Sequence, residues 1–125
     1  MGLSFRRHPG EFAVCRLAPD APIPVWAAQS PFSSITRTPA ELSIVSEAAC
    51  VPENAQAERG WACLELRGPF PFTLTGILSS ILKPLAEAQV PIFALSTYDT
   101  DWVLVPAVKI DAALQALRAA GHNEI

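Results

Sequence analysis

The sequence predicts an α+β fold, a ferredoxin-like α/β sandwich made of two tandem βαβ-type units, the first with a reduced helix. In the second half the residue patterns alternate as strand, helix, strand, strand, helix, and a right-handed crossover turns this order into such a sandwich. In the first half similar strands recur around a proline-rich segment that prevents a regular helix. Half of the residues are hydrophobic, which suits an ordinary folded protein.

The first half begins with ten residues that we expect to be loose, followed by a strand over Phe12–Leu17. Prolines in Ala18–Pro24 then favour coil, and Val25–Gln29 allows a short turn. Two Ile/Val/Thr-rich runs, Ser33–Arg37 and Leu42–Ser46, follow with a four-residue loop between them. This spacing predicts a β-hairpin.

After the hairpin, Pro52 is placed to open a single helical turn over Glu53–Ala57. The next strand is predicted over Trp61–Leu66. A helix should start near Thr73, whose hydroxyl can cap it. Pro84 should kink this helix and allows it to form as two segments. One helical stripe is formed by the apolar residues Leu74, Ile77, Leu78, Ile81 and Leu85.

The last part of the chain predicts two strands, Pro91–Ser96 and Trp102–Val105, joined by a polar turn. Asp111 can cap a final helix over Ala112–Ala119, and Gly121 can end it.

An internal repeat is indicated at an offset of 60 residues, where a hydroxyl-rich turn, an acid and an apolar strand recur. This offset superposes Glu41 on Asp101. We therefore expect two domains, an N-terminal degenerate unit over residues 1–60 and a complete C-terminal unit over residues 61–125.

Composition excludes several classes of function. A net charge of −3 and a pI near 5.3 argue against a nucleic-acid partner. Three cysteines without a C-x-x-C pair and only two histidines favour buried thiols in a reduced, cytoplasmic protein, with no metal or other cofactor. The sequence carries no predicted leader and no membrane span. Without a nucleophile motif, a small hydrolase that depends on His122 is a minor alternative.

Two strings, FSSITRTPAELSIV (32–45) and LSTYDTDWVLV (95–105), resemble the bacterial tandem ACT-domain proteins. With Gly68–Phe70, Thr75–Leu78 and Pro84–Ala88, the resemblance runs from Phe12 to Gly121. The layout is also similar to the eukaryotic cytosolic arginine sensor and, more distantly, to aspartate kinase regulatory domains. The resemblance implies amino-acid binding without catalysis.

The family resemblance also implies where a ligand would bind: at an interface between units, against the loop Gly68–Gly76, the strand Pro91–Leu95 and the turn Ser96–Asp101. A zwitterionic amino acid needs donors for its carboxylate, which a helix N-terminus offers, and an acid for its ammonium, which Asp99 or Asp101 offers. Aromatic side chains, Tyr98 among them, could wall the pocket. The candidate binding residues are Gly68, Pro69, Phe70, Phe72, Thr75, Gly76, Pro91, Ile92, Phe93, Ser96, Thr97, Thr100 and Asp101.

The function predicted from these residues is an allosteric sensor, a homodimer in which a bound amino acid changes an interface that a regulated partner protein reads. The alternative is a protein–protein interaction or structural module with a decayed ligand site. Pro91, which has no hydroxyl and no backbone N–H, favours this alternative, as do the prolines of the loop. The structural alternative to ligand binding by Asp101 is that it is a turn residue whose side chain hydrogen-bonds the backbone of its own turn.

Overall fold

The computed structural model describes residues 2–125, which form two compact units. The N-terminal unit is Gly10–Trp61, and the helical unit combines residues 2–9 with Ala62–Ile125.

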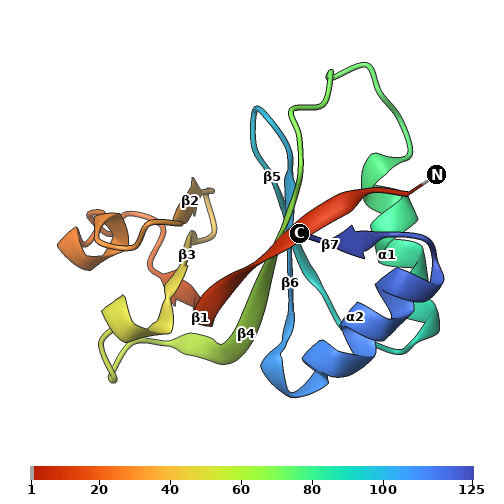
Figure 1. Cartoon of the computed structure of the whole chain (residues 1–125). Helices are drawn as coiled ribbons and strands as arrows, with labels where there is room; N and C mark the ends of the chain where they lie inside the picture. The colour runs from red at the N-terminus through yellow and green to blue at the C-terminus, as the bar shows by residue number, and fades with distance from the viewer. Residues whose placement is uncertain (1) are drawn as a thin grey trace. The chain divides into compact units, whose positions relative to one another are not determined.

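The helical unit confirms the predicted order of strand, helix, strand, strand and helix. Its strands lie in the order β1, β4, β6, β5, and β7 pairs in parallel with β1. Figure 1 shows α1 and α2 side by side on one face of these strands. The elements are β1 (Ser4–Leu17), β4 (Ala57–Leu66), α1 (Ile77–Glu87), β5 (Phe93–Ser96), β6 (Asp101–Pro106), α2 (Ile110–Ala119) and β7 (Asn123–Glu124).

Strand β1 starts at Ser4, so the prediction of a loose N-terminus is wrong for residues 4–10, and Met1 lies outside the described residues. The N–H of Arg67 donates to the carbonyl of Ser4 at 2.9 Å, which joins β1 to β4. The side chain of Phe5 is fully buried in the core of the helical unit. Arginines and a proline hide this strand in the sequence, because its pairing is set by β4 and β7 rather than by local pattern.

The core of the helical unit lies between the two helices and one face of the strands. Alternate residues of each strand point into it, as the two-residue period of a half-buried strand requires. The buried residues are Phe5, Ala62, Leu64, Leu66, Ile77, Ile81, Leu85, Val90, Val103, Val105, Ala113, Leu114 and Leu117.

Helix α1 begins at Ile77, one turn later than predicted. Its N-cap is Gly76, with a left-handed φ of 81°, and no side chain caps the helix. Leu74 therefore lies in the preceding loop and is 47% exposed. The predicted cap by Thr73 is wrong. Gly76 adopts a left-handed conformation, so the regular helix does not extend from Ile77 back to Thr73.

Pro84 lies inside α1, which continues through it as one element, so two segments do not form. The proline ring has no N–H to donate to the carbonyl of Ser80, four residues earlier. His122 supplies a donor instead: its Nε2 lies 3.0 Å from the Ser80 oxygen. Its Nδ1 accepts the Leu3 N–H at 3.0 Å. His122 is thus a buried structural residue whose two ring nitrogens contact the backbone of two separate segments.

Helix α2 is capped at Lys109 without a side-chain hydrogen bond, and Asp111 lies in its first turn, so the predicted Asp111 cap is wrong. The predicted stop at Gly121 is confirmed. The N–H of Gly121 donates to the Arg118 carbonyl and the N–H of His122 to the Leu117 carbonyl, both at 3.0 Å. With a Gly121 φ of 95°, this is a Schellman motif.

The N-terminal unit orders its strands as β2 (Ser34–Arg37), β3 (Leu42–Glu47) and β1. The predicted hairpin is confirmed, since β2 and β3 pair antiparallel with Ile35 opposite Ile44. The crossover is reduced to the 3-10 turn η1 (Val25–Ala28). A helical turn over Glu53–Ala57 does not form: the segment makes a tight turn and Ala57 already belongs to β4.

The internal repeat is present, with an offset of 59 residues rather than 60. Adding 59 to the bounds of β2, β3 and η2 (Ala48–Cys50) gives the bounds of β5, β6 and η3 (Ala107–Lys109). Glu41 therefore corresponds to Thr100, and the expected match between Glu41 and Asp101 is wrong by one residue. Within residues 2–125, no helix is long and apolar enough to cross a membrane.

Candidate functional site

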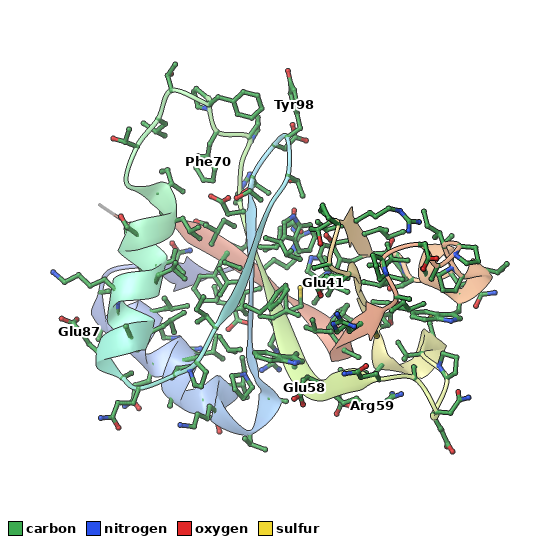
Figure 2. All side chains as sticks on the ribbon, turned by 180° about the vertical axis from the view of Figure 1, so that it is seen from behind. Glu41, Glu58, Arg59, Phe70, Glu87 and Tyr98 are labelled. Carbon is green, nitrogen blue, oxygen red and sulfur yellow. The ribbon has the colours of Figure 1, made fainter. Side chains whose placement is uncertain are left out.

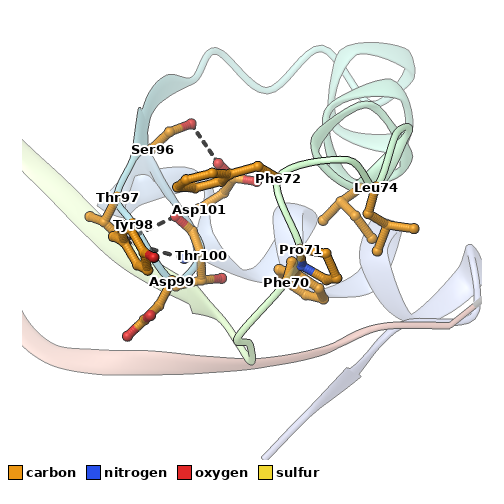
Figure 3. A pocket seen from close by; sticks show the side chains of 11 residues that line it. Phe70, Pro71, Phe72, Leu74, Ser96, Thr97, Tyr98, Asp99, Thr100 and Asp101 are labelled. Atoms are coloured by element: carbon orange, nitrogen blue, oxygen red, sulfur yellow. Dashed lines mark hydrogen bonds between the residues drawn. The ribbon is translucent and has the colours of Figure 1, made fainter.

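A pocket of about 200 Å³ opens in the helical unit between two segments, the loop that joins β4 to α1 and the turn that joins β5 to β6. Figure 3 shows the two segments facing each other across it. The residues that line it are Phe70, Pro71, Phe72, Leu74, Ile77, Ser96, Thr97, Tyr98, Asp99, Thr100 and Asp101.

The β5–β6 turn is closed by its own hydrogen bonds. The N–H and the hydroxyl of Thr97 both donate to the carbonyl of Thr100, at 2.8 and 3.1 Å. The hydroxyl of Thr100 is buried and donates to the carbonyl of Leu66, at the end of β4, at 2.7 Å. These bonds fix the turn to the neighbouring strand, so the pocket has a rigid polar wall.

Two carboxylates belong to this wall. The hydroxyl of Ser96 donates to Oδ1 of Asp101 at 2.5 Å, which orients that carboxylate, and Asp99 lies at the tip of the turn. Among the lining residues, all within the described chain, none is Lys, Arg or His. The wall therefore favours a cationic group in a ligand.

The opposite wall is apolar. Its Phe72 meets Tyr98, which comes from the β5–β6 turn, edge to face with ring centroids 5.0 Å apart, although the two residues are 76% and 81% exposed. Figure 2 shows Tyr98 and Phe70 at one end of the unit, with Glu87 at the far end of α1. Aromatic rings this exposed contribute little to the core, and they are available to cover an apolar part of a ligand.

The N-terminus of α1 also reaches the pocket, since its first residue, Ile77, is part of the lining. The first amides of a helix have no acceptor within it, and the positive end of the helix dipole lies there. With no side-chain cap at Gly76, these amides are available to an anion. Acids and a helix N-terminus thus border one apolar hollow.

Gly68 allows the two segments that line the pocket to approach each other closely. The N–H of Phe70 donates to the carbonyl of Asp99 at 2.9 Å, next to Gly68. A Cβ on residue 68 would lie 2.7 Å from that same oxygen, so only glycine allows this approach.

Six of the candidate residues line the pocket and seven do not. Pro71 and Leu74 also line the pocket and belong to the predicted loop Gly68–Gly76, although they are not among its named candidates. Ile77 is outside the predicted site, because the sequence places it in the core stripe of the helix. Within residues 2–125, no three His, Cys, Asp or Glu side chains gather closely enough to hold a metal ion. The structure brings together Phe70, Phe72, Ser96, Thr97, Thr100 and Asp101, and leaves Gly68, Pro69, Thr75, Gly76, Pro91, Ile92 and Phe93 outside the lining.

Comparison with known proteins gives matches over most of the chain. The family model of the ACT domain matches residues 56–119, and a model described as an N-terminal domain matches residues 10–54. Human CASTOR3P is 32% identical in an alignment of 87 positions, and the match covers 59% of this chain and 53% of the human protein. The chain thus spans about half the length of this relative.

Among solved structures, protein Atu0741 from Agobacterium tumefaciens is 35% identical, with a TM-score of 0.94 over 100% of this chain and 93% of that one. The regulatory subunit of aspartate kinase from Thermus thermophilus shares the fold at 14% identity, with a TM-score of 0.62 over 95% and 94% of the two chains. These matches confirm the resemblance noted in the sequence. The chain belongs to the ACT-domain family, whose members are typically ligand-binding regulatory domains.

Proposed function

We propose that this protein is a non-catalytic sensor that binds a free amino acid in the pocket between the β4–α1 loop and the β5–β6 turn. One observation carries the proposal: two carboxylates and an uncapped helix N-terminus border the same apolar hollow. Membership of the ACT family supports a regulatory, ligand-binding role.

The pocket offers each part of an amino acid a matching partner. The ammonium group meets Asp101, whose carboxylate is already oriented by Ser96, and Asp99 adds a second negative charge to the lining. The carboxylate meets the free amides at the start of α1. The side chain lies against Phe70 and Phe72. A volume of about 200 Å³ suits a ligand of this size rather than a larger metabolite.

Binding would act by population shift in a homodimer. A ligand that contacts the loop and the turn together stabilises the arrangement in which they face each other, by its difference in affinity between arrangements. A cytoplasmic partner protein would then read the changed interface. This output needs no chemistry at the pocket.

The test is a thermal-shift screen of the purified protein against the twenty amino acids. A ligand at a hundredfold excess over its Kd should stabilise the fold by about 2.7 kcal/mol. Asp101→Asn should abolish the shift. Glu87→Gln removes one negative charge at the other end of α1, outside the pocket lining, and should keep it.

A second pair of variants separates binding from folding. Phe72→Ser and Tyr98→Ser change exposed rings, so they should alter the stability of the free protein by less than about 0.5 kcal/mol while weakening the ligand. If none of the twenty amino acids shifts the melting temperature of the wild-type protein, the result would favour the alternative, an interaction module whose ligand site has decayed.

A further inference from the structure

A second hollow, of about 360 Å³, lies in the helical unit away from the pocket described above. It is lined by Arg6, Glu65, Arg67, Gly68 and Ile125, so two of its five lining residues are arginines. We propose that this cavity, which we call the arginine cavity, binds a small, multiply charged oxyanion through Arg6 and Arg67.

Strand pairing explains how the two arginines come together. The N–H of Arg67 donates to the carbonyl of Ser4, and the N–H of Arg16 donates to the carbonyl of Gln56, so β1 and β4 run antiparallel. The first of these bonds places Arg6 beside Glu65 and diagonal to Arg67. Their neighbours Phe5 and Leu66 point into the core beneath the helices. Alternation therefore puts both arginines on the other face of the strands, where both are exposed.

The charges of the two guanidinium groups are not neutralised by neighbours. Among residues 2–125, the salt bridges are His8 with Glu65 and Arg118 with Glu124, and neither involves these arginines. Glu65, the one acid in the lining, has Oε1 2.7 Å from Nε2 of His8. The side chains of the lining thus carry two guanidinium groups and one carboxylate, in a chain whose net charge is −3.

This chemistry selects an oxyanion. A guanidinium group is planar, always charged and presents several N–H donors in a fixed fork that fits carboxylate or phosphate oxygens two at a time. Two forks from adjacent strands suit an anion with more than one charge, such as a phosphate or a dicarboxylate. A monovalent spherical ion would use neither fork fully.

The arginine cavity is distinct from the amino-acid pocket, although Gly68 brings them close. Gly68 lines the cavity, and Asp99 and Thr100, which approach Gly68 closely, line the pocket. The proposal does not rest on amino-acid binding, and the two can be tested separately because their charged residues differ.

The test is isothermal titration of the full chain with inorganic phosphate and, separately, with succinate, both at constant ionic strength maintained with chloride. We expect saturable binding of at least one of the two. Arg6→Gln and Arg67→Gln should each weaken it about tenfold or more, since each removes a charge-assisted contact. Arg7→Gln is the matched control, because it removes the same charge one residue away and outside the cavity lining.

Either of two results would overturn the proposal: no saturable binding of phosphate or succinate, or equal weakening by Arg7→Gln. Asp101→Asn distinguishes this failure from that of the amino-acid site, because it should leave anion binding within about twofold of wild type. Circular dichroism of each variant confirms that a loss of binding is not a loss of fold.

Discussion

Replacing His122 by alanine is expected to destabilise the helical unit strongly, and the loss should depend on Pro84. The substitution leaves two partly buried backbone groups without their His122 partner, the Ser80 carbonyl and the Leu3 N–H. Each unsatisfied group costs about 1–3 kcal/mol, so we expect a loss of about 3 kcal/mol in the free energy of unfolding. Urea unfolding followed by circular dichroism measures it.

A double-mutant cycle tests the reason for this loss. In Pro84→Ala, the new N–H can donate to the Ser80 carbonyl as in any α-helix, so that carbonyl no longer depends on His122. His122→Ala should then cost about 1–2 kcal/mol less than in the wild-type background. Lys83→Ala, an exposed change in the same helix, should be additive with His122→Ala. Additivity of Pro84→Ala and His122→Ala within about 0.5 kcal/mol would refute the reasoning.

Three further predictions concern stability. Gln89 ends α1 with a left-handed φ of 60°, so Gln89→Gly should raise the free energy of unfolding by about 1 kcal/mol, whereas Gln89→Ala should not. Thr100→Val should lower it by about 1–2 kcal/mol through loss of the bond to Leu66, and Thr100→Ser should restore most of it. Burial raises the pKa of Cys63 to about 12, helped by the negative charge of Glu65. The folded state therefore keeps a proton that the unfolded state loses above about pH 9, and stability should fall from there toward pH 12 by about 1.4 kcal/mol per pH unit, with a flatter slope in Cys63→Ala.

The elements that the sequence predicts well are those set by local pattern. The hairpin from Ser34 to Glu47 and the stop at Gly121 follow from alternation and from turn residues, and the structure has both. Strand β1 before Gly10 is different, because its charged residues carry no alternation and its pairing partner is 60 residues away in the chain. Long-range pairing of this kind leaves no signal in a single sequence.

The candidate site is predictable only in part for the same reason. The turn Ser96–Asp101 is a local feature, and all six of its residues line the pocket. The predicted strand start at Pro91 is wrong, since β5 begins at Phe93, and Pro91 lies outside the lining. Leu74 continues a helical apolar period in the sequence but lies in a loop, because Gly76 adopts a left-handed conformation that no periodicity reveals.

The repeat shows how the hairpin that borders the pocket differs from its counterpart in the N-terminal unit. In both hairpins the first residue of the turn is a threonine, Thr38 or Thr97, whose N–H and hydroxyl donate to the carbonyl three residues later. The backbone of the turn is therefore the same, and the difference lies in the two residues that flank it.

In the helical unit the flanking residues are Ser96 and Asp101, which pair with each other at the pocket. Their counterparts in the N-terminal unit, 59 residues earlier, are Arg37 and Leu42. The guanidinium of Arg37 donates to the carbonyls of Pro19 and Ala21 in the proline-rich segment, and Leu42 is fully buried. In the N-terminal unit, which has no crossover helix, Arg37 and Leu42 therefore stabilise the fold. The carboxylate and hydroxyl of the proposed ligand site stand in the unit where the β4–α1 loop and the start of α1 line the same pocket.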